Sequence, residues 1–168
     1  MLLVLLSVVW GGSFFFSGIA LREFPTLSIV TARVGLAALA LLFLMKMIGQ
    51  GIQLNRQILK AFFGMSFLNN VVPFSLIVWG QQHIASGVAS ILNATTPLFT
   101  MLVAHWFTTD EKINPRRLLG VLTGMGGVGL MMGLDSMESS GFHLVGQSTI
   151  LLATFSYGLA GVYGKRFA

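Results

Sequence analysis

Two asparagine–proline pairs could place polar groups in the middle of otherwise apolar segments. Asn69 stands four residues before Pro73, and Asn93 stands four residues before Pro97. A proline inside a helix removes one backbone hydrogen bond and frees the carbonyl four residues earlier, which here belongs to the asparagine. In lipid such polarity must be satisfied or must face a cavity. We therefore predict a polar solute site that includes Asn70, Asn93 and Pro97; the alternative is two kinked helices held by interhelical hydrogen bonds.

Arg33 and Trp10 are two further candidates for contact with a solute. Arg33 is the one formal charge well inside an apolar segment, where an ionisable residue is costly and usually functional. It could bind an anionic carboxylate, extend toward a polar interface, or bond to backbone carbonyls. Trp10 lies beside the small residues 11–13. It could stack on an apolar or cationic solute, or it could be a packed or lipid-facing indole.

Other chemistry finds little support in these residues. The chain has no cysteine, and no Asp or Glu falls inside an apolar segment. His83 and His105 could relay protons, but both lie at segment ends without a carboxylate at helical spacing. There is also no HExxH motif that would bind zinc. We therefore expect no cofactor, no metal site and no enzymatic activity.

The elements that must position these residues are membrane-spanning helices. Of the 168 residues, 55% are hydrophobic and only 9% are charged, whereas a soluble domain carries about 25% charge. A helix that crosses the hydrocarbon core needs about 20 apolar residues. Six such runs occur, and together they predict an all-α polytopic transmembrane helical bundle. They cover residues 1–21, 24–45, two runs within 61–109 that divide at 81–86, 118–134 and 144–164.

Charge placement predicts the orientation of these spans. The net charge of +5 could suggest nucleic acid, but the charges lie in short loops, so we expect membrane lipid and no nucleic acid as partner. One side carries eight basic residues and the other only Arg22 among its loops. The eight are Lys46, Arg56, Lys60, Lys112, Arg116, Arg117, Lys165 and Arg166. Basic loops stay cytoplasmic, so we predict a cytoplasmic N-terminus in a bacterial-type inner membrane.

The sixth span resembles the first when the sequence is shifted by 147 positions. Trp10 and Gly11 then align with Tyr157 and Gly158. A repeat of five helices is odd-numbered, so its second copy enters the membrane from the opposite side, as in many secondary transporters. We predict a first repeat over residues 1–134 and the loop and first helix of a second repeat over 135–168, with four more helices expected beyond it.

Glycines of the fifth span have the spacing of a helix-packing motif. Gly120 and Gly124 are four residues apart, as are Gly129 and Gly133. Such spacing lets helices approach closely. The partner helix could belong to the same bundle, to the missing second repeat, or to a second copy of the chain.

Several motifs, taken in order, resemble the EamA family of the drug/metabolite transporter superfamily. They are Trp10-Gly11-Gly12-Ser13-Phe14, Pro25 with Thr31-Ala32-Arg33, the run 85–99 from Ala85 to Phe99, Asp110-Glu111-Lys112-Ile113, and Gly120, Gly124 and Gly127-Val128-Gly129. The resemblance implies ten helices, cytoplasmic termini and the movement of small metabolites. We expect part of a secondary transporter for amino-acid-like or drug-like solutes. The alternative is a non-transporting membrane assembly or receptor-like protein.

Overall fold

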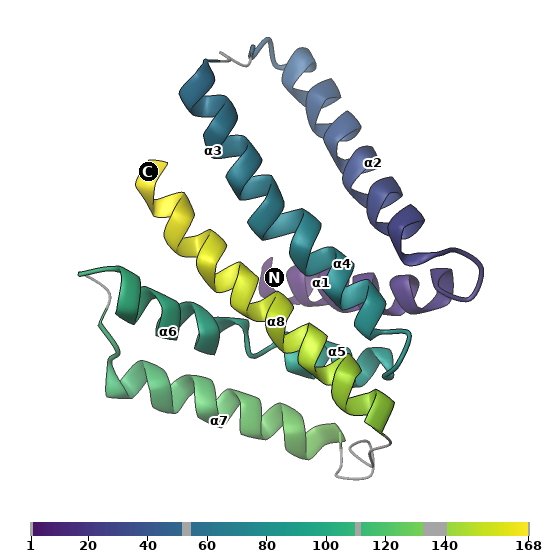
Figure 1. Ribbon diagram of the computed structural model, residues 1–168, viewed down its shortest axis with the longest axis vertical. Coiled ribbons are helices and arrows are strands. Elements are labelled where there is room, and N and C mark those ends of the chain that lie inside the picture. Colours follow the sequence, from purple (N-terminus) through teal and green to yellow (C-terminus); the bar gives the residue numbers. More distant parts are fainter. Residues whose placement is uncertain (1, 52–54, 110–111, 133–140, 168) are drawn as a thin grey trace.

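A computed structural model describes residues 2–51, 55–109, 112–132 and 141–167, and within these ranges the chain is helical with no strand. The prediction of an all-α transmembrane bundle is confirmed (Figure 1). The α-helices are α1 (Leu2–Ala20), α2 (Thr26–Met47), α3 (Arg56–Ser66), α4 (Val72–Gly80), α5 (Ser86–Asn93), α6 (Thr96–Phe107), α7 (Pro115–Met132) and α8 (Gly141–Gly164). A π-helical turn, Phe67–Val71, joins α3 to α4, and a 3-10 turn, Lys165–Phe167, follows α8.

Five helical segments are long and apolar enough to cross a membrane. They are Leu2–Ala20, Thr26–Met47, Arg56–Gly80, Ser86–Phe107 and His143–Phe167. The predicted short span at 118–134 corresponds to α7, which has 18 residues. Its last two predicted positions, and most of the loop predicted at 135–141, lie outside the described residues.

Helix α8 runs across the middle of the bundle, with α3 and α4 on one side and α6 on the other (Figure 1). Its side chains Ile150, Ala153 and Thr154 are fully buried. Glycines bring the helices together, because a Cβ atom on Gly80 of α4 would lie 2.9 Å from the carbonyl oxygen of Gly146 in α8. The helix predicted to open a second repeat therefore forms the centre of this structure.

The third span changes its helical register next to Pro73. The backbone N–H of Val72 donates to the carbonyl of Phe67, five residues back, which is the π-helical pattern. In that register the carbonyl of Leu68 would accept from residue 73, but proline has no N–H. The hydroxyl of Ser156 in α8 donates to Leu68 O instead, at 2.7 Å. The proline was expected to free the Asn69 carbonyl; the π turn moves the interhelical hydrogen bond one residue earlier.

The fourth span breaks into two helices just before Pro97. Helix α5 ends at Asn93 and α6 begins at Thr96. The Thr96 hydroxyl donates to the carbonyl of Asn93 at 2.7 Å, and the Thr95 hydroxyl donates to Leu92 O at 2.7 Å. The Thr96 hydroxyl thus satisfies the Asn93 carbonyl, which Pro97 leaves without its usual helical N–H donor.

Candidate functional site

A cavity of about 500 Å³ lies where α1, α2, the π turn, α4, α6 and α8 meet. This volume is within the range of small-molecule sites in proteins. Its wall combines apolar, aromatic, amide and hydroxyl side chains with one arginine. The residues are Leu6, Val9, Trp10, Ser13, Arg33, Asn69, Asn70, Phe74, Thr96 and Tyr157.

Arg33 reaches the cavity from α2 and lies against an aromatic ring of α4. Its guanidinium carbon is 4.3 Å from the centroid of the Phe74 ring, a cation–π contact. The side chain is half-buried, and no hydrogen bond joins it to another described residue. Within the described residues, Arg33 therefore makes no bond to a backbone carbonyl, and contact with a carboxylate or extension toward an interface stays a prediction.

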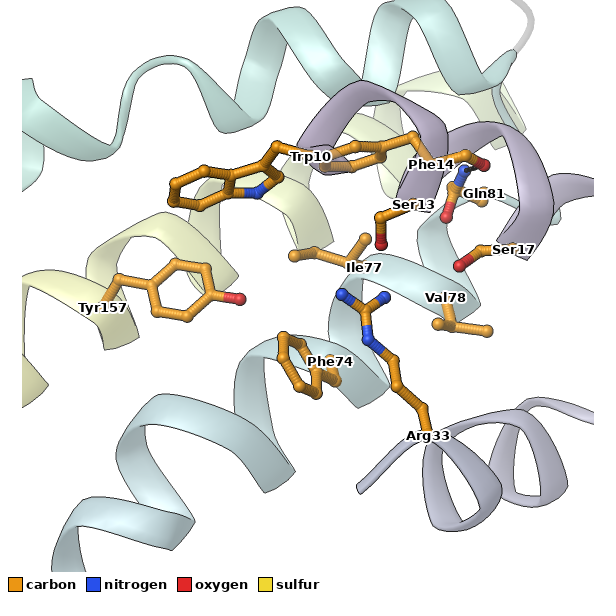
Figure 2. A pocket seen from close by; sticks show the side chains of 10 residues that line it. All are labelled: Trp10, Ser13, Phe14, Ser17, Arg33, Phe74, Ile77, Val78, Gln81 and Tyr157. Carbon is orange, nitrogen blue, oxygen red and sulfur yellow. Dashed lines mark hydrogen bonds between the residues drawn. The ribbon is translucent and has the colours of Figure 1, made fainter. Parts of the chain in front are cut away.

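Trp10 and Tyr157 face the same space from α1 and α8 (Figure 2). These are the two residues that the internal repeat aligns with each other. Trp10 retains 60% of its accessible surface, and Tyr157 is half-buried. Two amphipathic aromatic side chains at equivalent repeat positions thus form part of the cavity wall together with Arg33.

Asn69 and Asn70 enter the cavity wall from the π turn. Asn69 is exposed and Asn70 is half-buried. Asn70 and Phe74 are four residues apart, so both lie on one face of the third span. Single π turns inside helices often occur at functional sites, and this one contributes two amides to the cavity.

Glutamines connect the helices at the end of the bundle where the chain turns from α4 into α5. The buried Gln81 donates from Nε2 to the Phe14 carbonyl of α1 and to Ser86 Oγ, both at 3.0 Å. Gln82 donates from Nε2 to Thr26 Oγ1 of α2 at 2.9 Å. A small space of about 20 Å³ lies beside Gln81, Ser17 and Arg33 (Figure 2). These contacts hold α1 and α2 to α4 at this end of the cavity.

The structure brings together three of the five predicted site residues. Trp10, Arg33 and Asn70 line one cavity, whereas Asn93 and Pro97 are not among its lining residues. Asn93 is 9% exposed, and its Oδ1 atom has no hydrogen-bond partner among the described residues. Pro97 is exposed. The pair shapes the break in the fourth span without lining this cavity.

Phe74 and Tyr157 line the cavity but were not predicted as site residues. Tyr157 had a usable signal, because the internal repeat aligns it with Trp10. Phe74 had none, since a phenylalanine in an apolar run looks like any other core residue. Among the described residues, no group of three or more His, Cys, Asp or Glu side chains could hold a metal ion.

A sequence model described as the EamA-like transporter family matches residues 1–133. The chain belongs to this family. The match covers all of α1 to α7 and therefore most of the cavity-forming elements. No solved structure matches the chain.

Curated relatives of this EamA-family chain carry transporter names. The chain is 24% identical to the "Uncharacterized transporter YoaV" of Bacillus subtilis over 163 residues, which are 97% of this chain and 56% of that protein. It is 29% identical to the "Uncharacterized inner membrane transporter YedA" of Escherichia coli K12 over 161 residues, 96% of this chain and 51% of that protein. The chain thus spans about half the length of these relatives. With its apolar helices, it is an integral membrane protein of a transporter family.

Proposed function

We propose that this chain forms one half of a secondary transporter that moves small amino-acid-like or drug-like metabolites across the inner membrane. The observation that carries the proposal is the cavity of about 500 Å³ with Arg33, two amides and three aromatic side chains inside an apolar bundle. Polar groups at this depth are costly unless they serve a binding site or pathway. Trp10, Arg33 and Asn70 would contact the solute directly.

Asn93 and Pro97 take an indirect part in this proposal. Their break in the fourth span ends one helix at Asn93 and starts the next at Thr96, whose side chain lines the cavity. Discontinuous helices are a common feature of transporter binding sites. The buried Oδ1 atom of Asn93, which has no hydrogen-bond partner among the described residues, would accept a hydrogen bond from a second repeat as the two repeats move.

The two helices aligned by the internal repeat differ sharply in their packing, which supports an arrangement of two paired repeats. A Cβ atom on Gly158 of α8 would lie 3.1 Å from the carbonyl oxygen of Phe99 in α6, so this glycine permits a close backbone approach. Its counterpart Gly11 in α1 has nothing within 4 Å of the same position. In α1 only Phe14 and Ser17 are buried.

Two inverted repeats would remove this difference. If the fold is inverted and repeated, α1 should pack against the third and fourth spans of the second repeat as α8 packs against α4 and α6. The relatives have nearly twice the length of this chain, which is enough for such a second repeat. Alternating access would then come from the rocking of one repeat against the other around the cavity.

Counterflow in proteoliposomes tests this proposal without knowledge of the coupling ion. The full encoded protein is reconstituted in vesicles loaded with a mixture of unlabelled amino acids, and the uptake of labelled amino acids is followed. We expect uptake above that of empty vesicles for at least one solute. Trp10→Ala should reduce it roughly 2- to 30-fold, since a stacking or cation–π contact with an aromatic side chain contributes about 0.5–2 kcal/mol.

Trp106→Ala is the matched control, because Trp106 is 73% exposed near the end of α6 and lies outside the cavity. Equal losses in the two variants would argue that Trp10 acts through stability alone. If uptake of every solute in the mixture matched that of empty vesicles, the transport proposal would be contradicted for this solute class.

A second candidate function is a membrane assembly that does not transport. The observation that favours it is an open glycine face on α7, where a Cβ atom on Gly120 or Gly124 would meet nothing within 4 Å. A helix of another chain would fit there. A single cysteine at Gly124 should give a disulfide-linked dimer under oxidation in this case, and none if a second repeat of the same polypeptide covers the face.

A further inference from the structure

Among the described residues, the positive charge of Arg33 has no acidic counterpart in the cavity. No Asp or Glu is among the residues that line the cavity or the small space beside it. The sequence has five acidic residues, and of these Glu23 falls in the described part, exposed in the turn between α1 and α2. A charge inside a low-dielectric bundle is costly without a partner. A bound anion would supply that partner.

The guanidinium is arranged so that an anion can reach its N–H edge. The guanidinium carbon lies 4.3 Å from the centroid of the Phe74 ring, and a guanidinium that stacks on a ring by its face keeps its N–H edge available. Figure 2 shows the guanidinium nitrogens directed toward the space between Ser13 and Tyr157. A planar carboxylate can accept two parallel hydrogen bonds from such an edge.

The rest of the cavity suits an apolar or aromatic group on the same molecule. Leu6, Val9 and Trp10 of α1 form one wall, and Phe74 of α4 contributes to the wall on the arginine side. Offset or edge-to-face contacts between aromatic rings stabilise a bound ring beyond the area that it buries. Asn69 and Asn70 remain for a polar substituent, since each amide both donates and accepts.

We infer that the cavity selects solutes that join a carboxylate to an apolar or aromatic body, with Arg33 binding the carboxylate. This inference rests on the proposed function and deepens it, because it assigns a charge to the substrate class. A neutral isostere should bind more weakly, and a cation should bind least, because Arg33 repels it.

Competition binding with three probes that share one aromatic body tests the inference. They are N-acetylphenylalanine, an anion; N-acetylphenylalaninamide, which is neutral; and phenylalaninamide, a cation. The full encoded protein in nanodiscs is incubated with radiolabelled N-acetylphenylalanine, and each probe competes. We expect the anion to bind roughly 10- to 100-fold more tightly than the neutral probe, as charge-assisted hydrogen bonds predict.

Substitutions at Arg33 test whether this residue recognises the negative charge of the probe. Arg33→Gln should abolish the preference for the anion, so that the ratio of the affinities for the anionic and the neutral probe falls to about one. Arg33→Lys should leave a reduced preference, because it keeps the charge and loses the bidentate geometry. Arg22→Gln is the control, since Arg22 is exposed in the turn after α1. A merely structural role of Arg33 would weaken both probes alike and would not change their ratio.

Several results would overturn the inference. They are equal or tighter binding of the neutral or cationic probe by the unmodified protein, an anion preference that survives Arg33→Gln, and no binding of any probe at millimolar concentration. If Arg33→Gln does not fold, the affinities of the unmodified protein and of Arg33→Lys for the three probes still test the inference. The proposed function fails separately, if the protein binds the anion but shows no counterflow of any solute.

Discussion

At the scale of single residues, the hydroxyl of Ser156 links the central helix to the irregular part of the third span. It donates to Leu68 O at 2.7 Å across the α8 interface. Ser156→Ala should lower the free energy of unfolding by about 0.5–1.5 kcal/mol, because the partly buried Leu68 carbonyl loses its hydrogen bond from α8. Unfolding by SDS from mixed micelles measures this change.

Ser148→Ala on the same helix is the control for that substitution. The Ser148 hydroxyl is exposed and bonds locally to Leu144 O at 2.8 Å. Its removal should change the free energy of unfolding by less than about 0.5 kcal/mol. Equal effects at positions 148 and 156 would show that the contact with Leu68 does not stabilise the protein.

Site residues could be predicted from the sequence where a polar or charged side chain is energetically costly inside an apolar segment. Arg33 and Asn70 are polar inside apolar segments, so they could be identified from the sequence, and both line the cavity. Asn93 is also a polar residue in an apolar segment, but it is buried and does not line the cavity. A polar residue in an apolar segment must have a partner, and the sequence shows this. Which partner it has depends on how each helix is rotated about its axis, and an almost uniformly apolar segment does not reveal that rotation.

At the scale of elements, Gly158 sets the distance between α8 and α6. Gly158→Ala would place a methyl group 3.1 Å from Phe99 O and 3.2 Å from Thr100 N. Both atoms are backbone, so the helices must separate. We expect a loss of about 1–3 kcal/mol in the free energy of unfolding, typical of overpacking, measurable by SDS unfolding.

Gly161→Ala is the control one turn further along α8. A Cβ atom there would lie 3.7 Å from the Thr100 side chain, an ordinary van der Waals contact. We expect no loss, or a gain of up to about 1 kcal/mol from the higher helix propensity of alanine. A gain of similar size at both positions would contradict the close approach of α6 and α8.

Element boundaries followed from proline and polar residues, but local helix geometry did not. The predicted division of the 61–109 run at 81–86 is present, whereas at Pro97, where a kink was expected, the fourth span is divided into α5 and α6. The π turn was not predicted from Pro73, since a proline in a helix can produce a kink, a π turn or a break. The choice depends on Ser156, a residue 88 positions away that satisfies Leu68 O.

At the scale of the whole molecule, the orientation of the bundle is open to a direct test. The chain lacks cysteine, so single cysteines can be introduced without background. Glu23→Cys and Gln57→Cys are both at exposed positions, and the predicted topology places them on opposite sides of the membrane. In intact cells a membrane-impermeant maleimide should label position 23 and leave position 57 unmodified until the membrane is permeabilised, because basic loops stay cytoplasmic. The reverse pattern would overturn the proposed cytoplasmic N-terminus.

The sequence predicts that the molecule is a transmembrane helical bundle, but it predicts less about how the helices pack against one another. Hydropathy and charge placement predict the helices, and the internal repeat aligns α1 with α8. The repeat does not reveal that α8 takes the central position while α1 keeps an open face at Gly11. That difference depends on which neighbours are present, and a match between two helices carries no information about neighbours.

Transport through this bundle requires that water reach the cavity, and a single cysteine at position 70 tests for that access. Asn70 lines the cavity from the third span. We predict that in the full encoded protein Asn70→Cys reacts with a membrane-impermeant thiol reagent from at least one side of the membrane, and that N-acetylphenylalanine slows the reaction. Phe43→Cys, 64% exposed on α2 outside the cavity, should stay unmodified in lipid. Absence of reaction at position 70 from both sides would show that the cavity is closed to water and would contradict the proposed transport pathway.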